Sequence, residues 1–212
     1  MKRFALIFLF ALSAAAQPVS VGVLGGVPLV DQTRTYSSPL DQDESRPYIV
    51  GPSVEIRLPA GFAIEADGLY QRIGSTFQNS IAFLPAGATS AEITTSTNRA
   101  RANVWEFPLL GKYYFRRDSA WRPFVGTGFA FRTAGFHETG TETFLNSNGL
   151  SSIFRTADNY RSDLEVGATV AAGVRYRVGH VALQPQFRYT RWGGSNGILR
   201  NDEAAFYLGL SF

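Results

Sequence analysis

Apolar and polar side chains alternate with a period of two along much of the chain, and the C-terminal segment shows the pattern most clearly. In the last ten residues, Phe206, Leu208 and Leu210 fall on one face of an extended strand, while Tyr207, Gly209 and other small residues fall on the opposite face. The same alternation predicts eight β-strands, at 19–30, 48–58, 62–71, 103–115, 122–132, 163–178, 181–192 and 203–212.

The segments between these strands alternate in length. We interpret the short ones as turns, at 59–61, 116–121 and 179–180, and the longer ones as loops, at 31–47, 72–102, 133–162 and 193–202. This pattern predicts an antiparallel meander with all its short turns at one end. In outer-membrane barrels such turns face the periplasm and the long loops face outside, and an even strand count brings both termini to the periplasmic side.

One face of the predicted strands carries charge and the other carries almost none. We place ten charged side chains on the first face: Glu55, Arg57, Glu65, Asp67, Glu106, Lys112, Glu165, Arg175, Arg177 and Arg188. A soluble barrel would show the same alternation with the two faces exchanged. Aromatic residues decide between the two, because they gather near both strand ends, as Tyr113 and Phe115 do at a short turn and Tyr70 and Trp105 do near a loop. The predicted fold is therefore an all-β, eight-stranded antiparallel up-and-down transmembrane β-barrel.

The first sixteen residues have the form of a secretory signal peptide. Lys2 and Arg3 give a positive start, an uncharged apolar run follows, and small residues lead to Ala16. The apolar run is too short to span a bilayer as a helix, which takes about 20 residues. We therefore expect a signal peptide at 1–16 and a single barrel domain at 17–212.

Composition narrows the classes of function. Of the 20 Lys and Arg residues, Lys2 and Arg3 belong to the predicted signal, which leaves 18 basic against 17 acidic side chains. A mature chain so close to neutrality is poorly suited to bind nucleic acid. The chain has no cysteine, which excludes disulfides, thiol chemistry and a lipid-modified N-terminal cysteine.

Three stretches resemble the small eight-stranded outer-membrane barrels, the OmpA/OmpX-like group of porin-like outer-membrane β-barrel domains. These stretches are 106–115, 122–128 and 206–212. The resemblance implies a location in the bacterial outer membrane, and it implies that the barrel-assembly machinery reads the last strand through Phe212. It also implies contact with outer-membrane lipid. The peptidoglycan-binding domain that follows the barrel of OmpA has no counterpart here, so we do not expect a cell-wall tether.

An eight-stranded barrel has room inside for side chains and little else. The ten charges on the inner face comprise five acidic and five basic groups, and we expect them to pair because an unpaired buried charge is costly. The favoured function is a monomeric, non-enzymatic barrel with a largely closed, salt-bridged lumen, which serves envelope structure and surface interaction through its extracellular loops. The alternative is a narrow pore or conduit for small or apolar solutes, with Phe77, Phe83 and Phe144 lining a pocket at the barrel mouth.

Arginine is the dominant cation, since Lys112 is the single lysine outside the predicted signal. Eight arginines fall near the outer strand ends: Arg46, Arg72, Arg99, Arg101, Arg132, Arg161, Arg191 and Arg200. Guanidinium groups hold phosphates through two hydrogen bonds, so this collar is a candidate contact for the phosphates of an anionic outer-leaflet glycolipid. A solvated rim that pairs with nearby aspartates is the alternative.

The sequence offers little support for catalysis. The chain has two histidines, His137 in a predicted loop and His180 in a turn at the opposite end of the barrel. A lipid-modifying enzyme of the outer leaflet, the third function considered, requires His137 beside a serine such as Ser147 or Ser151. No residues have the spacing of a metal site, and we predict no enzymatic activity, cofactor or metal.

Overall fold

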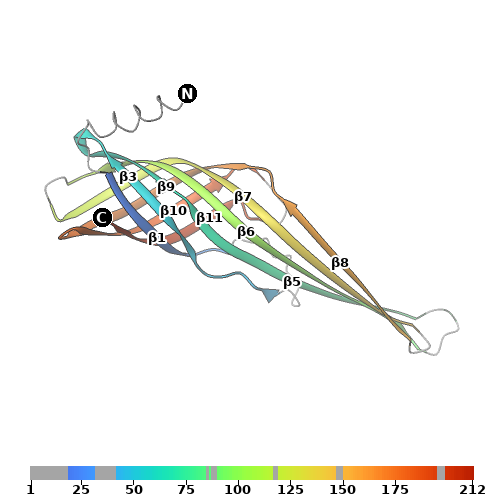
Figure 1. Ribbon diagram of the computed structural model, residues 1–212. Coiled ribbons are helices and arrows are strands. Elements are labelled where there is room, and N and C mark those ends of the chain that lie inside the picture. The colour runs from blue at the N-terminus through green and yellow to red at the C-terminus, as the bar shows by residue number, and fades with distance from the viewer. Residues whose placement is uncertain are drawn as a thin grey trace, which may run out of the picture.

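The backbone closes into a barrel whose wall is one antiparallel sheet (Figure 1). The structure is a computed structural model that describes residues 19–31, 42–84, 86, 90–116, 119–146, 150–194 and 199–212. The predicted signal peptide, 1–16, lies outside these residues. The described residues include no helix that is long and apolar enough to cross a membrane.

Eleven strands are assigned in the described part of the chain. They are β1 (Val19–Pro28), β2 (Gln42–Asp43), β3 (Ile49–Arg57), β4 (Phe62–Asp67), β5 (Leu69–Phe83), β6 (Glu92–Tyr114), β7 (Trp121–Leu145), β8 (Ser151–Arg161), β9 (Glu165–Val178), β10 (Val181–Trp192) and β11 (Asp202–Ser211). Two pairs of these, β4 with β5 and β8 with β9, each form one wall strand with a short interruption, and β2 continues the line of β3 beside β5.

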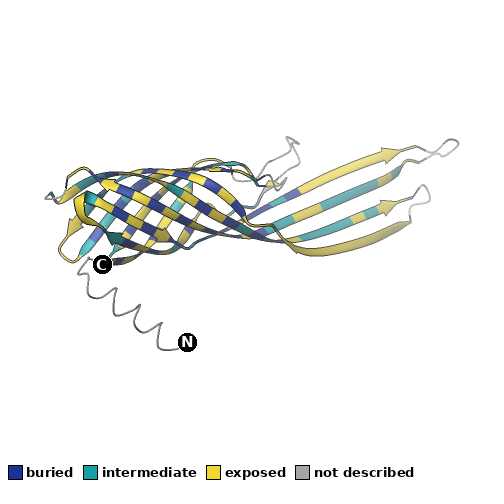
Figure 2. Ribbon diagram, turned by 90° about the horizontal axis from the view of Figure 1, so that it is seen from above, coloured by how far each residue is buried: buried dark blue, intermediate teal, exposed yellow. Residues whose placement is uncertain are grey.

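The wall therefore has eight strands, and β1 closes it by pairing with β3 on one side and β11 on the other. The predicted eight-stranded antiparallel up-and-down barrel is confirmed. Burial also alternates along the wall as the sequence pattern predicted (Figure 2). On β11, for example, Ala205 and Tyr207 are buried, while Phe206 and Leu208 are exposed. An apolar outer face around a polar interior is the arrangement of a membrane barrel.

Tight turns join the strands at one end of the barrel, which we call the turn end. The 3₁₀ turn η1 (Pro59–Gly61) connects β3 to β4, and Ala60 and Gly61 adopt positive φ angles of 66° and 85°. Gly179 and His180 connect β9 to β10, and Gly179 has a φ of 62°, which glycine adopts without steric cost. The predicted two-residue hairpin is thus present.

One glycine of the wall is required by a close backbone approach. β4 and β5 are separated at Gly68, whose amide donates to the carbonyl oxygen of Pro52 at 3.0 Å. A Cβ atom added to Gly51 would lie 1.9 Å from the carbonyl oxygen of Gly68. A side chain at position 51 would therefore force the two strands apart.

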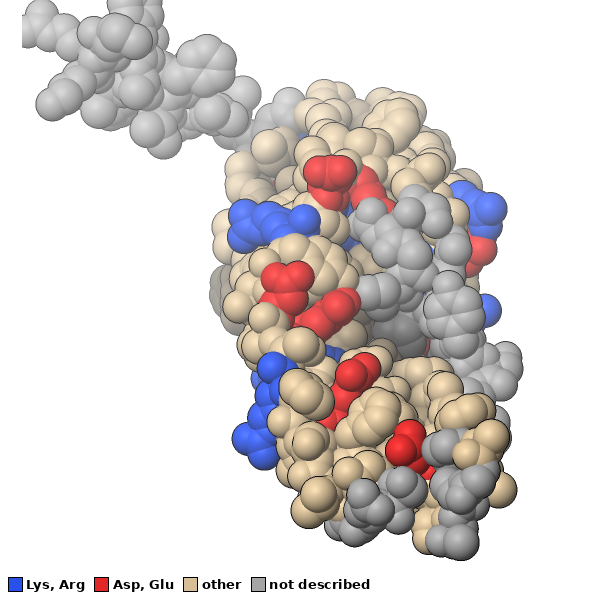
Figure 3. All heavy atoms as spheres, turned by 90° about the vertical axis from the view of Figure 1, so that its right-hand side faces the viewer, with Lys and Arg blue, Asp and Glu red and all other residues tan. Residues whose placement is uncertain are grey.

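At the other end, four strands continue well beyond the barrel (Figures 1 and 2). They form an antiparallel sheet in the order β5-β6-β7-β8. We call this sheet the extension, and it comprises residues 75–83, 92–101, 137–145 and 151–161. Figure 3 views the molecule from this end.

The extension corrects the sequence analysis, which read 72–102 and 133–162 as loops. Most of both segments is strand, since β5 runs to Phe83, β6 begins at Glu92 and β7 runs to Leu145. The physical reason is that neither face of this sheet packs on a core, so the apolar half of the alternation is missing. The sequence feature of these segments that still favours strands is their high content of threonine, a β-branched residue.

Candidate functional site

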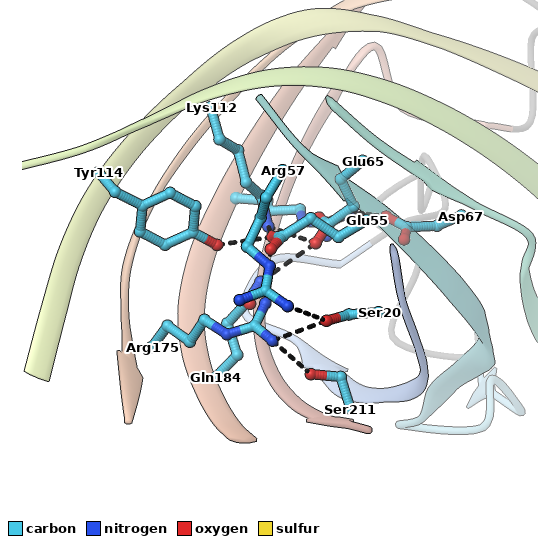
Figure 4. Close-up of polar contacts among 11 residues, drawn as sticks. Ser20, Glu55, Arg57, Glu65, Asp67, Lys112, Tyr114, Arg175, Gln184 and Ser211 are labelled. Atoms are coloured by element: carbon cyan, nitrogen blue, oxygen red, sulfur yellow. Dashed lines mark hydrogen bonds and ion pairs between the residues drawn. The ribbon is translucent and has the colours of Figure 1, made fainter. Parts of the chain in front are cut away.

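Charged side chains from opposite walls meet inside the barrel, in the half nearer the turn end (Figure 4). We call this group the lumen network, and its six charged members are Glu55, Glu65, Asp67, Lys112, Arg175 and Arg188. All six were predicted to face the lumen, and all are buried. Three are cations and three are anions, so the group is neutral when every member is ionised.

The six groups form a chain of alternating charge. Arg175 Nη1 lies 2.5 Å from Glu55 Oε1, and Glu55 Oε2 lies 3.6 Å from the Lys112 ammonium. Lys112 also pairs with Glu65. Glu65 Oε1 is 2.7 Å from Arg188 Nη2, and Arg188 Nη1 is 2.6 Å from Asp67 Oδ2. Each cation therefore neutralises a carboxylate that would otherwise be buried at a cost of several kcal/mol.

Neutral donors and acceptors complete the network. The Tyr114 hydroxyl donates to Glu55 Oε2 at 2.6 Å, and Gln184 Nε2 donates to Glu65 Oε2 at 3.1 Å. Arg175 Nη2 donates to the Ser20 hydroxyl at 2.9 Å. A cavity of about 10 Å³ borders Ser20, Glu55 and Gln184, which is the space that a single buried water occupies.

A second buried group lies nearer the extension. Arg132 directs both Nε and Nη2 to Glu165 Oε2, at 2.8 and 2.5 Å, and its guanidinium lies 4.3 Å from the centre of the Trp192 ring. The Trp192 indole donates to Glu203 Oε2 at 3.2 Å. Glu203 was missed by the sequence analysis, although it falls on the same face of β11 as Ala205 and Tyr207 and the alternation alone would have placed it inside.

Glu106, another predicted lumen residue, is buried and accepts a hydrogen bond from Gln71 Nε2 at 3.1 Å. The remaining two of the ten predicted lumen charges are less buried, and Arg57 borders the lumen network at Ser20 (Figure 4). Arg57 is only half buried near the turn end, where its Nη2 donates to the Ser20 hydroxyl at 3.2 Å, and Arg177 is exposed. Both sit close to the last residue of their strands, where the barrel opens to solvent.

Apolar side chains cover the charged groups at both ends of the lumen. Tyr114, Phe124 and Ala63 form a buried cluster at the turn end, and the Lys112 ammonium lies 4.4 Å from the centre of the Phe124 ring. A second buried cluster lies at the extension end of the barrel, and its members are Ile73, Ala102, Val104, Ala134, Phe136 and Leu199. The charged groups of the interior thus lie between two buried apolar clusters.

Four of the predicted collar arginines lie together on the outer surface, where the barrel meets the extension. Arg46, Arg72, Arg99 and Arg101 line a groove of about 560 Å³, and among the described residues Glu44 is the one carboxylate that lines it. Arg99 Nη2 lies 2.5 Å from Glu44 Oε2, and Arg101 Nη2 lies 3.4 Å from it. The hydrogen bond from Arg99 is the largest cause that lowers the pKa of Glu44 below its usual value. We call this the arginine groove.

The other four collar arginines are spread out. Arg161 and Arg200 are exposed, and Arg191 pairs with Asp202 at the end of β10. Arg132 does not belong to the rim, because only 3% of its surface is exposed and its guanidinium lies in the lumen with Glu165. Arg132 points into the lumen because it lies on the inward-facing side of β7, even though it is near the end of the predicted strand.

Aromatic rings encircle the outer surface at two levels. Beside the arginine groove, Tyr70 and Trp105 pack with ring centres 5.1 Å apart, and the Tyr70 hydroxyl donates to Asn103 Oδ1 at 2.8 Å. Near the turn end, Phe62 and Tyr113 pack at 5.1 Å, among others. Aromatic side chains at two levels are typical of a barrel that crosses two membrane interfaces.

The structure separates His137 from Ser151, one of the two serines considered for a lipid-modifying enzyme. His137 Nδ1 lies 2.5 Å from Asn159 Oδ1 on the extension. Ser151 pairs with Leu145, eight residues farther along β7 and thus about 26 Å from His137. Ser147 lies outside the described residues, and His180 is at the turn end. Within the described residues, no three acidic or histidine side chains are grouped as metal ligands.

The pocket expected from Phe77, Phe83 and Phe144 is not present in the described part of the chain. Phe83 and Phe144 lie near the hairpin ends of the extension, and Phe83 is 64% exposed. Phe77 alone borders a hollow, at the base of the extension. Phe136 and Leu199 belong instead to the buried cluster at the extension end of the barrel.

Comparison with known proteins agrees with this geometry. A family model described as outer membrane protein beta-barrel domain matches residues 15–193. Neisserial surface protein A is 14% identical over 91% of this chain and 95% of its own, with a TM-score of 0.50. Two Pseudomonas aeruginosa proteins are also similar: the N-terminal barrel domain of OprF, at 14% identity over 91% and 97% of the two chains with a TM-score of 0.40, and OprG, at 11% over 92% and 94% with a TM-score of 0.43. A search of curated protein sequences gave no match.

Proposed function

Since this chain belongs to the outer membrane protein β-barrel domain family and is a protein of the bacterial outer membrane, we propose that it is a closed, non-enzymatic barrel that serves envelope structure and surface interaction. The proposal places the turn end in the periplasm and the extension outside the cell, because short turns face the periplasm in barrels of this kind. It takes the barrel to be a monomer that the barrel-assembly machinery inserts.

The lumen network is the observation that carries the closed barrel. β3 and β9 lie four strands apart in a ring of eight, as do β4 and β10, so each pair forms opposite walls. The ion pairs Glu55–Arg175 and Glu65–Arg188 therefore span the full width of the lumen. An ion could pass only after these buried pairs separated, and breaking a buried pair costs about 3–5 kcal/mol.

Reconstitution into a planar lipid bilayer tests the closed barrel. We expect no steady conductance from the wild-type barrel under conditions in which a general porin conducts. Arg177→Gln, which changes an exposed arginine outside the lumen network, is the matched control and should behave like wild type. Stable, protein-dependent currents from wild-type barrels would refute closure.

The extension supports the surface-interaction part of the proposal. Among the described strands, β8 pairs with β7 alone, and its eleven residues are all exposed. At the opposite side of the sheet, β5 is likewise unpaired over 77–83 in the described residues. Free strand edges offer unpaired amides and carbonyls to a partner strand, and proteins that do not use such edges usually protect them.

Shortening the extension tests its role. Phe77 pairs with Asn98, and Thr139 pairs with Ala157, so replacing 78–97 and 140–156 by two-residue turns keeps the register of the barrel. Cells that produce the shortened chain should attach less to immobilised proteins than cells that produce equal amounts of the full chain. Equal attachment by both would refute an interaction role for the extension.

The arginine groove supports an anionic glycolipid of the outer leaflet as a further partner. The groove opens on the outer surface next to Tyr70 and Trp105, the level at which a membrane places lipid headgroups. Arg46 and Arg72 have no carboxylate partner within 4 Å among the described residues, so their guanidinium groups are available to phosphate. Arg46→Gln with Arg72→Gln should lower the glycolipid phosphate that copurifies with the barrel, whereas Arg177→Gln should not. Unchanged phosphate in the double variant would refute this partner.

A further inference from the structure

The two faces of the extension carry opposite charge. Successive residues of a strand point to opposite faces, and the pairing register aligns the four strands row by row. The face that continues from the lumen, which we call the inner face, carries the four acidic residues Glu92, Glu138, Glu142 and Asp158 and no Lys or Arg. The outer face carries Arg99, Arg101, Arg155 and Arg161 and no acidic residue.

This assignment of faces agrees with the contacts. Phe136, which belongs to the buried cluster at the barrel mouth, stacks on Tyr160 with ring centres 4.9 Å apart, and the Tyr160 hydroxyl donates to Glu138 Oε1 at 2.6 Å. On the outer face, Arg99 reaches Glu44 in the arginine groove. Seen from the extension end, acidic side chains lie across the middle of the molecule and basic ones at its flanks (Figure 3).

The inner face also offers a hollow and apolar side chains. At its base a hollow of about 390 Å³ is lined by Phe77, Asn98, Glu138, Thr156 and Asp158, among others. Arg99 also borders this hollow, and its guanidinium is paired with Glu44. Toward the hairpin ends the same face presents Ile81, Phe144 and Phe154, all of them exposed. An exposed surface that combines aromatic and acidic residues suits a partner that carries both apolar groups and positive charge.

The acidic residues are placed at a cost to the sheet. Glu138 and Asp158 are direct cross-strand partners, and like charges in directly opposite positions destabilise a sheet. Burial and the hydrogen bond to Glu138 raise the pKa of Tyr160 to about 12, so this hydroxyl remains a donor at neutral pH. Tyr160 offsets part of the negative charge of Glu138, and no described side chain pairs with Asp158 through an ion pair.

We propose that the inner face of the extension binds an extended, basic polypeptide segment that also carries apolar side chains. The inference rests on the proposed function, in which the extension is an interaction surface, and adds the chemistry of the partner. From the row of Ser75 to the row of Phe83 the face is about 26 Å long, which matches an extended segment of about eight residues. Its cations pair with Glu138, Glu142 and Asp158, and its apolar groups contact Phe77, Phe144 and Phe154.

A labelled peptide tests the proposal directly. The probe is a twelve-residue peptide of alternating arginine and leucine, and the reference probe has glutamate in place of arginine. Binding is measured by fluorescence anisotropy to the full chain in nanodiscs of zwitterionic lipid, and binding to empty nanodiscs is subtracted. We expect the arginine peptide to bind at least tenfold more tightly than the glutamate peptide.

Two double variants separate a local site from net charge. Glu138→Gln with Asp158→Asn should weaken binding of the arginine peptide about tenfold, since each exposed pair contributes modestly. Asp31→Asn with Asp163→Asn removes the same charge from exposed positions off the inner face and should change affinity less than twofold. Phe154→Ser, at an exposed position, should weaken binding severalfold without disturbing the fold.

Three results would overturn the proposal: equal binding of the two peptides, equal weakening by the two double variants, or no effect of Phe154→Ser. Loss of the peptide interaction would leave the closed barrel and the attachment experiment unaffected, since neither depends on this charge pattern. Conversely, a conducting barrel that still bound the arginine peptide would refute closure and keep this inference.

Discussion

Replacing Arg188 by methionine removes the cation that the buried carboxylates of Glu65 and Asp67 share. The guanidinium lies 2.7 Å from Glu65 Oε1 and 2.6 Å from Asp67 Oδ2, and it also lies 4.9 Å from the centre of the Tyr207 ring. Methionine keeps much of the apolar stem and none of the charge. Glu65 retains Lys112 as a partner, whereas Asp67 has no other ion pair in the described residues.

The expected loss follows from these contacts. At an effective dielectric constant of about 20, a pair of unit charges at such a distance attracts by roughly 6 kcal/mol, and the desolvation of both groups offsets part of this. Removal of one partner from a buried pair costs about 3–5 kcal/mol, because the other charge stays buried and unpaired. We therefore expect Arg188→Met to lower the free energy of unfolding by about 3–5 kcal/mol.

A second substitution separates lost charge from lost packing. Arg188→Met combined with Asp67→Asn removes the orphaned charge, and we expect it to recover at least half of the loss. The free energy of unfolding is measured by urea titration of the barrel in lipid vesicles, followed by tryptophan fluorescence, with an unchanged dependence on urea as the sign that the two end states are unaltered. A loss below about 1 kcal/mol for Arg188→Met, or no recovery in the double variant, would mean that water reaches these charges and that the lumen is not closed.

Three further outcomes are expected. Gly51→Ala should destabilise the barrel by more than about 2 kcal/mol in the same titration, because the new Cβ would lie 1.9 Å from the Gly68 carbonyl oxygen; a neutral effect would contradict that close approach. The pKa of Glu44 is lowered by Arg99, so its contribution to stability is present above the unfolded pKa of a glutamate and is lost as the pH falls through the folded value; an NMR titration should find this carboxyl ionised below its usual range in wild type and shifted upward in Arg99→Gln. Phe212→Ser should lower the amount of barrel inserted in cells and leave refolding in detergent unchanged, as pulse-chase and gel-shift assays report; equal insertion would refute the proposed assembly signal.

The barrel could be predicted from the sequence because its wall strands have two different surroundings, which require apolar and polar residues to alternate. Each wall strand faces hydrocarbon on one side and a packed polar lumen on the other, so a period of two is written into its residues, as in Phe206 and Tyr207 of β11. Both faces of the extension are in contact with water, so its residues do not alternate between apolar and polar. Its strands were therefore read as loops, even though their threonines favour extended backbone.

The sequence predicts which charged residues face the lumen, but it does not predict which of them form ion pairs with one another. Arg175 and Glu55 are 120 positions apart, and they meet because the ring of eight strands sets β9 opposite β3. Which residues share a level depends on the stagger between strands, and no local pattern encodes it. Arg132 shows the same limit: its place near a strand end suggested the rim, and its partner Glu165 on the neighbouring wall strand β9 became known only from the register.

Lys112 gives the barrel a built-in chemical reporter. It is the single lysine outside the predicted signal, and only 1% of its surface is exposed, with its amine held between two carboxylates. An acylating dye should therefore leave this side chain unmodified for as long as the cylinder stays intact and should label it at the rate of unfolding. The mass of the peptide that contains residue 112, followed over time, would then give the rate at which the barrel opens, without any engineered probe.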